Sequence, residues 1–323
     1  MRRVEEEARA LEDAATRSRQ FSASRPAVSA VARPLDAAAA ALAVVLCVSW
    51  GFNQVAVKLA LPEIPPLVQA AFRSTTGTLL LLVWIRVRGV NLTARDGSLV
   101  PGLVAGLLFG VEFLLIYRGL ALTSASRASL FLYTAPFFVV IGARWCLPGD
   151  RFGRSQWAGL LLSFAGLVVA FGMPTPGGDW RTLAGDLMLV LAGAAWAATT
   201  LVIKATKLVH AAYEKTLLYQ LIVSAPLLAL CAELSGERVV EMPSALAVAS
   251  LFYQTLWIGG VTYLAWFALI QRYSASRLSA FTFLAPLCGV AAGYLVMGDP
   301  LTPGFAVAVA LVVAGLVLVN RPR

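Results

Sequence analysis

Ten long runs of apolar residues follow one another along this chain, with short polar segments between them. The hydrocarbon core of a bilayer is about 30 Å thick and needs about 20 apolar residues per helix. Pro, Gly and Asp gather between the runs, which is typical of turns. The pattern therefore predicts an all-α membrane protein with ten transmembrane helices. The predicted spans are residues 36–60, 67–85, 99–118, 126–146, 155–173, 184–204, 214–232, 246–270, 276–297 and 303–320.

The composition supports this prediction. Of the 323 residues, 59% are hydrophobic and 13% are charged, whereas about 25% of the residues in soluble domains are charged. These values exclude a soluble globular domain, a disordered chain and a coiled coil. The four cysteines are far apart and His210 is the single histidine, so we expect neither a metal site nor a disulfide framework.

Basic residues predict the orientation in the membrane. Residues 1–35 are polar, with seven basic and five acidic residues, and lack the apolar core of a signal peptide. If this tail is cytoplasmic, thirteen Lys and Arg residues lie in the predicted inner loops and the C-terminus, and four lie in the outer loops. We therefore expect a multi-pass protein of the cell inner membrane with both termini in the cytoplasm. The net charge of +9 reflects this topology and does not indicate nucleic-acid binding.

A repeated segment divides the chain into two halves. Residues 124–136 read SASRASLFLYTAP and residues 274–286 read SASRLSAFTFLAP, with eight of thirteen positions identical. The first helix of each half carries a tryptophan followed eight residues later by a lysine: Trp50 and Lys58, then Trp196 and Lys204.

We expect a polar tail at 1–35, a first five-helix repeat at 36–173 and a second at 184–320. Because five is odd, the second repeat enters the membrane from the opposite side. Two inverted repeats are the usual architecture of transporters that work by alternating access. A duplication that only builds a stable bundle is the alternative.

These motifs resemble those of the drug/metabolite transporter superfamily, EamA type, over about residues 37–320. The resemblance rests on the W-x7-K pairs, the repeated A-S-R…A-P segments, the segment from Tyr263 to Phe267 and the A-G-L motifs. Gly-Asp pairs at Asp150 and Asp299 add to it, although the family more often has Glu there. The second half also has no arginine that matches Arg73.

The resemblance implies export of amino acids and related small metabolites across the bacterial inner membrane. Glu112 and Pro136 are similar to residues of the YddG-like branch of amino-acid exporters. A transporter of drugs, sugars or purine-like metabolites is the alternative within the same architecture. An intramembrane enzyme or a scaffold is the alternative from another class.

Glu112 lies in the interior of the third predicted span. An unpaired carboxylate costs several kcal/mol in a membrane, so it should face a cavity, be paired or hold a proton. It is therefore a candidate for proton coupling or for contact with a substrate ammonium group. The alternative is a structural pair with Arg73 or Arg118.

Three further basic residues are candidates for the substrate pathway or for structural roles. Arg73 has a planar fork that binds carboxylates, but it could instead tie helix ends together or reach toward the interface. Lys58 and Lys204 lie at helix ends, where reaching out to the interface is the default. Their equal spacing from Trp50 and Trp196 predicts one shared structural role.

Pro136 and Pro286 occupy matching positions in the middle of the fourth and ninth spans. A proline there removes a backbone hydrogen bond, and paired interruptions are a pointer to a substrate site at the midplane. Helix packing is the alternative. Separately, a groove of glycines on the third span predicts close approach of another helix, at Gly102, Gly106 and Gly110.

Aromatic residues within the spans are candidates for lining a cavity, although packing and interfacial positions explain aromatics equally well. Asn53 adds a polar group one turn after Trp50. The aromatic candidates are Trp50, Tyr117, Tyr133, Trp196, Tyr263 and Trp266.

No nucleotide-binding loop, nucleophile elbow or metalloprotease motif occurs in the sequence. We therefore expect a secondary transporter without cofactor or metal, and not an enzyme. The expected partners are a small-molecule substrate and the lipid bilayer, with protons as the candidate coupling ion and no nucleic acid. We expect a monomer or a homodimer.

Overall fold

The computed structural model describes residues 35–93, 96–123, 125–172, 179–298, 301 and 303–321. Within these ranges the structure is helical and has no β-strand, as expected for an all-α membrane protein. Nine helical stretches of the described residues are long and apolar enough to cross a membrane, and a shorter apolar helix of 17 residues follows them. The prediction of ten spans is confirmed.

The first half of the chain forms five spans, of which the fourth is built from two helices. Its helices are α2 (Ala37–Ala60), α3 (Pro66–Arg88), α4 (Leu99–Leu122), α5 (Ala125–Leu132), α6 (Ala135–Cys146) and α7 (Arg154–Phe171).

The second half forms the other five spans. Its helices are α8 (Trp180–Ala205), the short 3₁₀ helix η1 (Lys207–His210), α9 (Tyr213–Leu234), α10 (Ala245–Phe252), the π-helix η2 (Tyr253–Thr262), α11 (Tyr263–Arg272), α12 (Ala275–Phe281), α13 (Leu284–Met297) and α14 (Gly304–Asn320). The eighth span is the continuous run of α10, η2 and α11.

Local chemistry sets where several spans begin. The carboxylates of Asp36 and Asp179 accept hydrogen bonds from the backbone N–H groups of Ala39 (2.8 Å) and Thr182 (2.9 Å) in the first turns of α2 and α8. These bonds satisfy donors that have no partner within the helix. They also hold the pKa of both carboxyls below the usual range, together with a bond from Tyr273 to Asp36.

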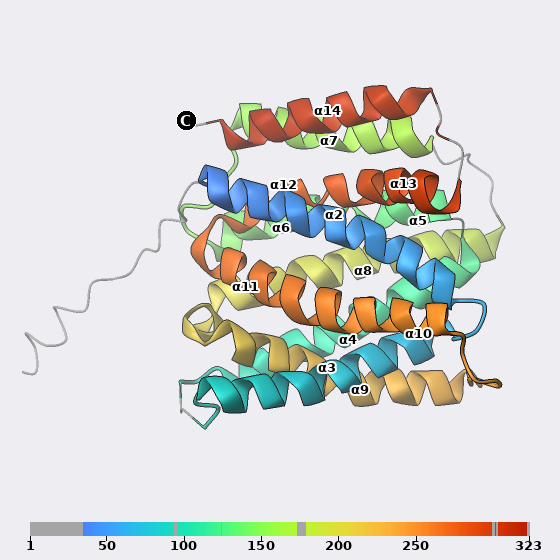
Figure 1. Cartoon of the computed structure of the whole chain (residues 1–323). Helices are drawn as coiled ribbons and strands as arrows, with labels where there is room; N and C mark the ends of the chain where they lie inside the picture. The colour runs from blue at the N-terminus through green and yellow to red at the C-terminus, as the bar shows by residue number, and fades with distance from the viewer. Residues whose placement is uncertain are drawn as a thin grey trace, which may run out of the picture. The chain divides into compact units, whose positions relative to one another are not determined.

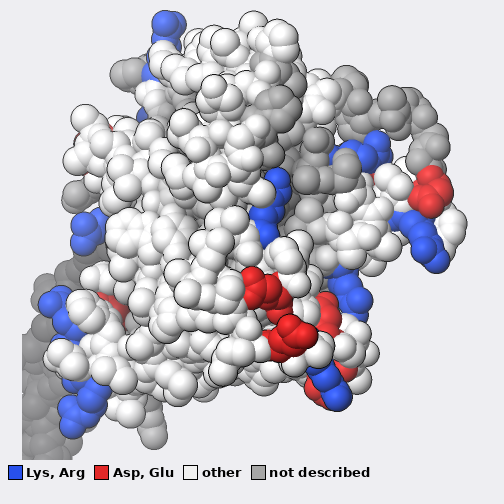
Figure 2. Space-filling model, turned by 45° about the vertical axis from the view of Figure 1, so that its right-hand side comes forward, with Lys and Arg blue, Asp and Glu red and all other residues white. Residues whose placement is uncertain are grey.

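The spans cross the bundle in alternating directions, so charged loop residues gather at its two ends (Figure 1). We call the end where α2 begins the basic end and the opposite end the acidic end. Figure 2 shows several acidic side chains close together on one part of the surface, with Lys and Arg side chains beside them and elsewhere on it. The basic end holds Arg86, Arg88, Arg144, Arg151, Arg154, Lys204, Lys207, Lys215, Arg272 and Arg321; the acidic end holds Glu63, Asp179, Glu233, Glu237 and Glu241.

The two halves run in opposite senses. Helix α2 runs from the basic to the acidic end, whereas α8, which opens the second half, runs from the acidic to the basic end. Helices α7 and α14, the last of each half, pack side by side at one edge of the bundle, and α3 and α9 pack at the other (Figure 1).

The glycine groove on α4 receives another helix, as predicted. A Cβ atom on Gly102 or Gly106 would lie within 2.5 Å of the side chain or carbonyl oxygen of Tyr219 on α9. One on Gly110 would lie 2.7 Å from Leu227 of the same helix. Helix α4, which carries Glu112, is thus held tightly against α9.

The fourth and ninth spans are interrupted at matching positions. Helix α5 ends at Leu132 and α6 begins at Ala135, while α12 ends at Phe281 and α13 begins at Leu284. Pro136 and Pro286 lie in the first turns of α6 and α13, so the predicted interruptions are confirmed. That these interruptions line a substrate site stays a prediction.

The interruptions free backbone carbonyl groups, which find other partners. The Thr134 hydroxyl donates to the Phe131 carbonyl oxygen at 2.6 Å. The Cys47 thiol of α2 donates to the Phe281 carbonyl oxygen at 3.2 Å, so the interruption in the ninth span contacts the first span directly.

Candidate substrate site

Four aromatic side chains predicted for the substrate pathway meet between α2, α8 and α11. The ring of Trp50 contacts those of Trp266 and Tyr263, with centroids 5.1 Å and 6.4 Å apart. Trp196 stacks on Trp266 at 6.2 Å. The Trp50 indole N–H donates to the Thr262 hydroxyl at 3.0 Å, which fixes the ring. Both halves of the chain therefore supply one aromatic cluster.

Helix α4 extends this aromatic cluster. Phe109 contacts Tyr263 at 5.8 Å and Phe113 at 4.9 Å, and Phe113 in turn contacts Tyr117 at 6.3 Å. Tyr117 was predicted for the pathway, but the two phenylalanines were not. Their spacing of four residues places them on one face of α4, and that periodicity could have identified them.

Arg73 and Glu112 lie beside this cluster, both buried, with 3% and 7% of their surface exposed. The Arg73 guanidinium carbon lies 4.1 Å from the centre of the Phe113 ring, a cation–π contact. Arg73 and Glu112 interact electrostatically but make no ion pair within 4.0 Å among the described residues. The predicted structural pair is therefore not formed as a direct contact.

The π-helix η2 lies against Arg73 and was not predicted. Gly259 has no Cβ, and one built there would lie 3.4 Å from Cγ of Arg73. One turn earlier, the Gln254 amide donates to the Gln69 side-chain oxygen at 2.9 Å, and Gln69 donates to the Ile64 carbonyl oxygen at 2.8 Å. Such wide turns often occur at functional sites.

Tyr133 and Asn53 lie close to the same region. Tyr133 interacts electrostatically with Tyr263 and Cys47, which places the end of α5 near the aromatic cluster. The side-chain oxygen of Asn53 is buried and accepts no hydrogen bond from the residues that the structure describes. Phe137, next to Pro136, contacts Phe283 at 6.4 Å, so the two interrupted spans touch each other.

Three basic residues have roles away from the cluster. Arg118, the alternative partner predicted for Glu112, donates instead to the Ser235 hydroxyl at the acidic end. Lys204 donates to the carbonyl oxygens of Ile270 (2.7 Å) and Gln271 (3.1 Å) at the end of α11. Lys58 is exposed and has no hydrogen-bond partner among the described residues. The structure thus holds the two lysines differently, and the shared structural role stays a prediction.

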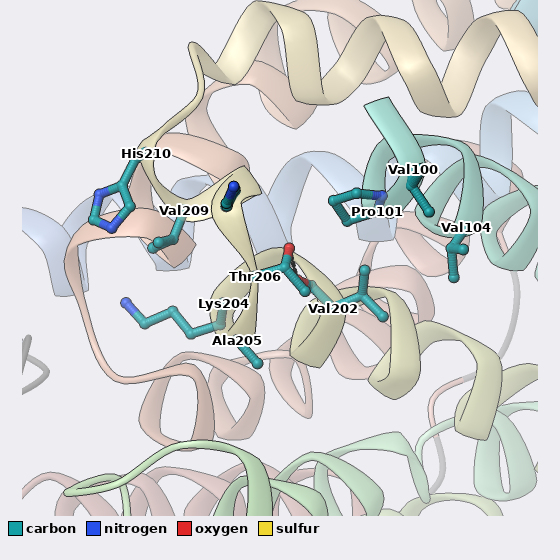
Figure 3. Close-up of a pocket in the computed structure, with 10 residues that line it drawn as sticks. Val100, Pro101, Val104, Val202, Lys204, Ala205, Thr206, Val209 and His210 are labelled. Atoms are coloured by element: carbon teal, nitrogen blue, oxygen red, sulfur yellow. Dashed lines mark hydrogen bonds between the residues drawn. The ribbon is translucent and has the colours of Figure 1, made fainter. Parts of the chain in front are cut away.

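A surface depression of about 700 Å³ lies at the basic end, between α4, α8 and η1. Figure 3 shows Lys204 and His210 on one side of it and Val100, Pro101 and Val104 on the other. It is wide open and mostly apolar, and it is separate from the aromatic cluster. Its polar lining residues are Lys204, Thr206, Lys207 and His210, and none of the aromatic or acidic candidates of the buried cluster lines it.

The buried cluster combines apolar rings with one guanidinium group and one carboxyl group. Rings bind apolar parts of a molecule, while an arginine and a carboxylate recognise opposite charges. Within the described residues no group of three or more His, Cys, Asp or Glu side chains could hold a metal ion. The arrangement is suited to binding a small organic molecule.

Comparisons with known proteins point the same way. The model of a family described as the EamA-like transporter family matches the chain twice, over residues 37–172 and 183–321. A solved crystal structure superimposes with a TM-score of 0.75 at 21% sequence identity, covering 88% of this chain and 96% of its own. This structural likeness concerns the fold alone.

The names of two relatives concern transport. The chain is 24% identical over 273 residues to the uncharacterized transporter YoaV of Bacillus subtilis, covering 83% of this chain and 91% of that one. It is 24% identical over 286 residues to a protein of Salmonella typhimurium named a probable amino-acid metabolite efflux pump, covering 85% and 92%.

Proposed function

The chain belongs to the EamA-like transporter family, and we propose that it exports neutral or aromatic amino acids, or closely related small metabolites, across the inner membrane. It does so as a secondary transporter, by alternating access. We propose further that both termini are cytoplasmic, that residues 36–173 and 184–320 act as the two moving repeats, and that protons are the coupling ion.

The observation that carries this proposal is the buried cluster shared by both halves. Trp50, Arg73 and Glu112 come from the first half, and Trp196 and Tyr263 come from the second. The halves run in opposite senses, so a rocking motion of one against the other exposes the shared site first to one side of the membrane and then to the other.

The chemistry of the cluster favours amino acids over sugars. Sugars are held by many hydrogen-bonding side chains, and here the amides of Gln69 and Gln254 are already bonded to each other. The aromatic rings suit an apolar side chain instead. The Salmonella typhimurium relative is named a probable amino-acid metabolite efflux pump, which supports amino acids as the substrate class.

The test is counterflow of labelled amino acids in proteoliposomes, with wild type compared with Glu112→Gln. We expect saturable flux of phenylalanine and leucine, and at least a tenfold loss in the variant. Glu233→Gln is the matched control, because Glu233 pairs with Arg238 on the exposed surface. Normal flux in Glu112→Gln would remove Glu112 from the pathway, and no flux of any amino acid from folded wild type would overturn the proposal.

Proton coupling is tested in the same vesicles. An imposed pH gradient should drive uphill movement of the amino acid in wild type. Glu112→Gln should still exchange label in counterflow, at its reduced rate, but should lose the response to the gradient. A wild-type response equal to that of empty vesicles would exclude coupling to protons.

A further inference from the structure

Three buried polar atoms beside the aromatic cluster have no hydrogen-bond partner among the described residues. They are Nε and Nη2 of Arg73 and Oε2 of Glu112. Leaving a buried charged group without a hydrogen bond costs several kcal/mol, so such atoms are uncommon in native proteins. Their presence on two neighbouring, oppositely charged side chains calls for a physical reason.

The two atoms of Arg73 lie on one edge of its planar group. Nε–H and one N–H of Nη2 point in parallel, and together they form the fork that receives both oxygens of a carboxylate. The flat face of the guanidinium is covered by Phe113 at 4.1 Å, so the edge is the part left for a ligand. Phe113 of α4 covers the guanidinium group, and Gly259 of η2 lies beside the aliphatic part of the side chain.

Glu112, the residue before Phe113 on α4, carries the acidic group. It interacts electrostatically with Arg73 and with Tyr263. If the pair served only to neutralise its own charges, the carboxylate would occupy the arginine fork, as buried Arg–Glu pairs do. Instead the two side chains form no ion pair within 4.0 Å, and Nε and Nη2 of Arg73 and Oε2 of Glu112 have no hydrogen-bond partner among the described residues.

We propose that Arg73 and Glu112 bind the two charged groups of a zwitterion, the α-carboxylate on the Arg73 fork and the α-ammonium on Oε2 of Glu112. The side chain of the substrate then lies against the rings of Phe109, Tyr263 and Trp50. This inference rests on the proposed function and deepens it, because it restricts the substrate to free α-amino acids with apolar or aromatic side chains.

The test compares three molecules that share one phenyl ring. L-Phenylalanine has both charges, 3-phenylpropanoate lacks the ammonium and 2-phenylethylamine lacks the carboxylate. Each is measured as an inhibitor of labelled phenylalanine counterflow by wild-type protein. We expect each truncated molecule to inhibit at least tenfold more weakly than phenylalanine, because each loses a charge-assisted hydrogen bond. Equal inhibition by all three would overturn the inference without any variant.

Two variants test which residue binds which charged group of the substrate. In Glu112→Gln, phenylalanine and 3-phenylpropanoate should differ less than about threefold in how strongly they inhibit counterflow. Phenylalanine should still inhibit much more strongly than 2-phenylethylamine. Arg73→Gln should give the reverse pattern. If Arg73 and Glu112 had purely structural roles, each variant would weaken inhibition by all three molecules equally. That result would overturn the inference. Monodisperse behaviour and an unchanged melting temperature in detergent identify variants that fold.

Failure of this inference is distinguishable from failure of the proposed function. Saturable phenylalanine flux without discrimination among the three molecules would overturn the zwitterion site and leave the transporter in place. No saturable flux of any amino acid in the panel would overturn both.

Discussion

Lys204 and Lys58 occupy matching positions in the two halves, yet they are held differently. At the basic end Lys204 binds two carbonyl oxygens at the end of α11, and the Gln271 amide donates to the Leu208 and Ala211 carbonyl oxygens at 3.1 Å and 3.0 Å. At the acidic end Lys58 is exposed and binds none of the described residues. The two ends of the bundle are therefore not equivalent, although the sequence repeat relates them.

Asp150 reinforces the basic end. This buried carboxylate of the first half accepts hydrogen bonds from the Ser274 hydroxyl (2.6 Å) and the Ser276 backbone N–H (3.2 Å), where α12 of the second half begins. Its counterpart Asp299 lies outside the described residues. At the acidic end the halves are joined by other contacts, among them Arg127 with Asp186 and Glu63 with Ser244.

The edge formed by α7 and α14 follows the repeat closely. A Cβ atom on Gly315 would lie 2.5 Å from the Gly159 carbonyl oxygen, and one on its repeat partner Gly166 would lie 2.8 Å from the Ala308 carbonyl oxygen. The two repeats make similar close contacts where α7 packs on α14, and they make different contacts at the two ends of the bundle.

The largest effect is expected at the symmetric edge, from Gly315→Ala. The added methyl group meets Ser163 and the backbone of Gly159, which cannot move without separating α7 from α14. We expect a loss of about 2 to 3 kcal/mol in the free energy of unfolding, measured in detergent. Gly142→Ala is the control, since its methyl group meets only the flexible end of Leu201 and should cost much less. Equal costs would show that α7 and α14 are not rigidly packed.

Sequence reasoning predicted the spans, the repeat and the proline interruptions, because each depends on local composition or on regular spacing. It brought forward Trp50, Trp196, Tyr263 and Trp266, which the structure places in one cluster. Whether these residues carry substrate stays a prediction.

What sequence reasoning missed depends on contacts between distant segments. The sequences around the two lysines do not reveal that Lys204 is hydrogen-bonded and that Lys58 is exposed. The π-helix at residues 253–262 also contains no proline, and it packs against both α3 and α2, which lie far away in the sequence.

A middle-sized effect is expected from the two lysines, and it tests the difference between the ends directly. Lys204→Met removes two hydrogen bonds to carbonyl oxygens of α11, which should cost about 1.5 kcal/mol of stability. Lys58→Met removes no bond to the described residues and should change stability by less than about 0.5 kcal/mol. Thermal unfolding of both variants in one detergent is the measurement. Equal losses would mean that Lys58 is bound as Lys204 is and that the asymmetry is not a property of the resting protein.

The smallest effect is expected in the loops, where pH separates the two ends. Hydrogen bonds from Ser98 and Lys215 hold the pKa of Asp96, at the basic end, well below its ordinary value of 3.8. Bonds from Ser244 lower the pKa of Glu63, at the acidic end, from its ordinary value of 4.5. Because both pKa values are lowered by folding, both contributions are present above the unfolded pKa and are lost as pH falls below it.

The unfolding midpoint of wild type should therefore exceed that of Glu63→Gln by a constant amount at neutral pH, and the difference should shrink below about pH 4.5. The corresponding difference in midpoint between wild type and Asp96→Asn should persist to lower pH and shrink only below about pH 3.8. Acid thus releases the contacts of Glu63 before those of Asp96. Midpoints measured in steps from pH 7 to pH 3 test this order, and simultaneous loss at both ends would show that the loop contacts do not distinguish them.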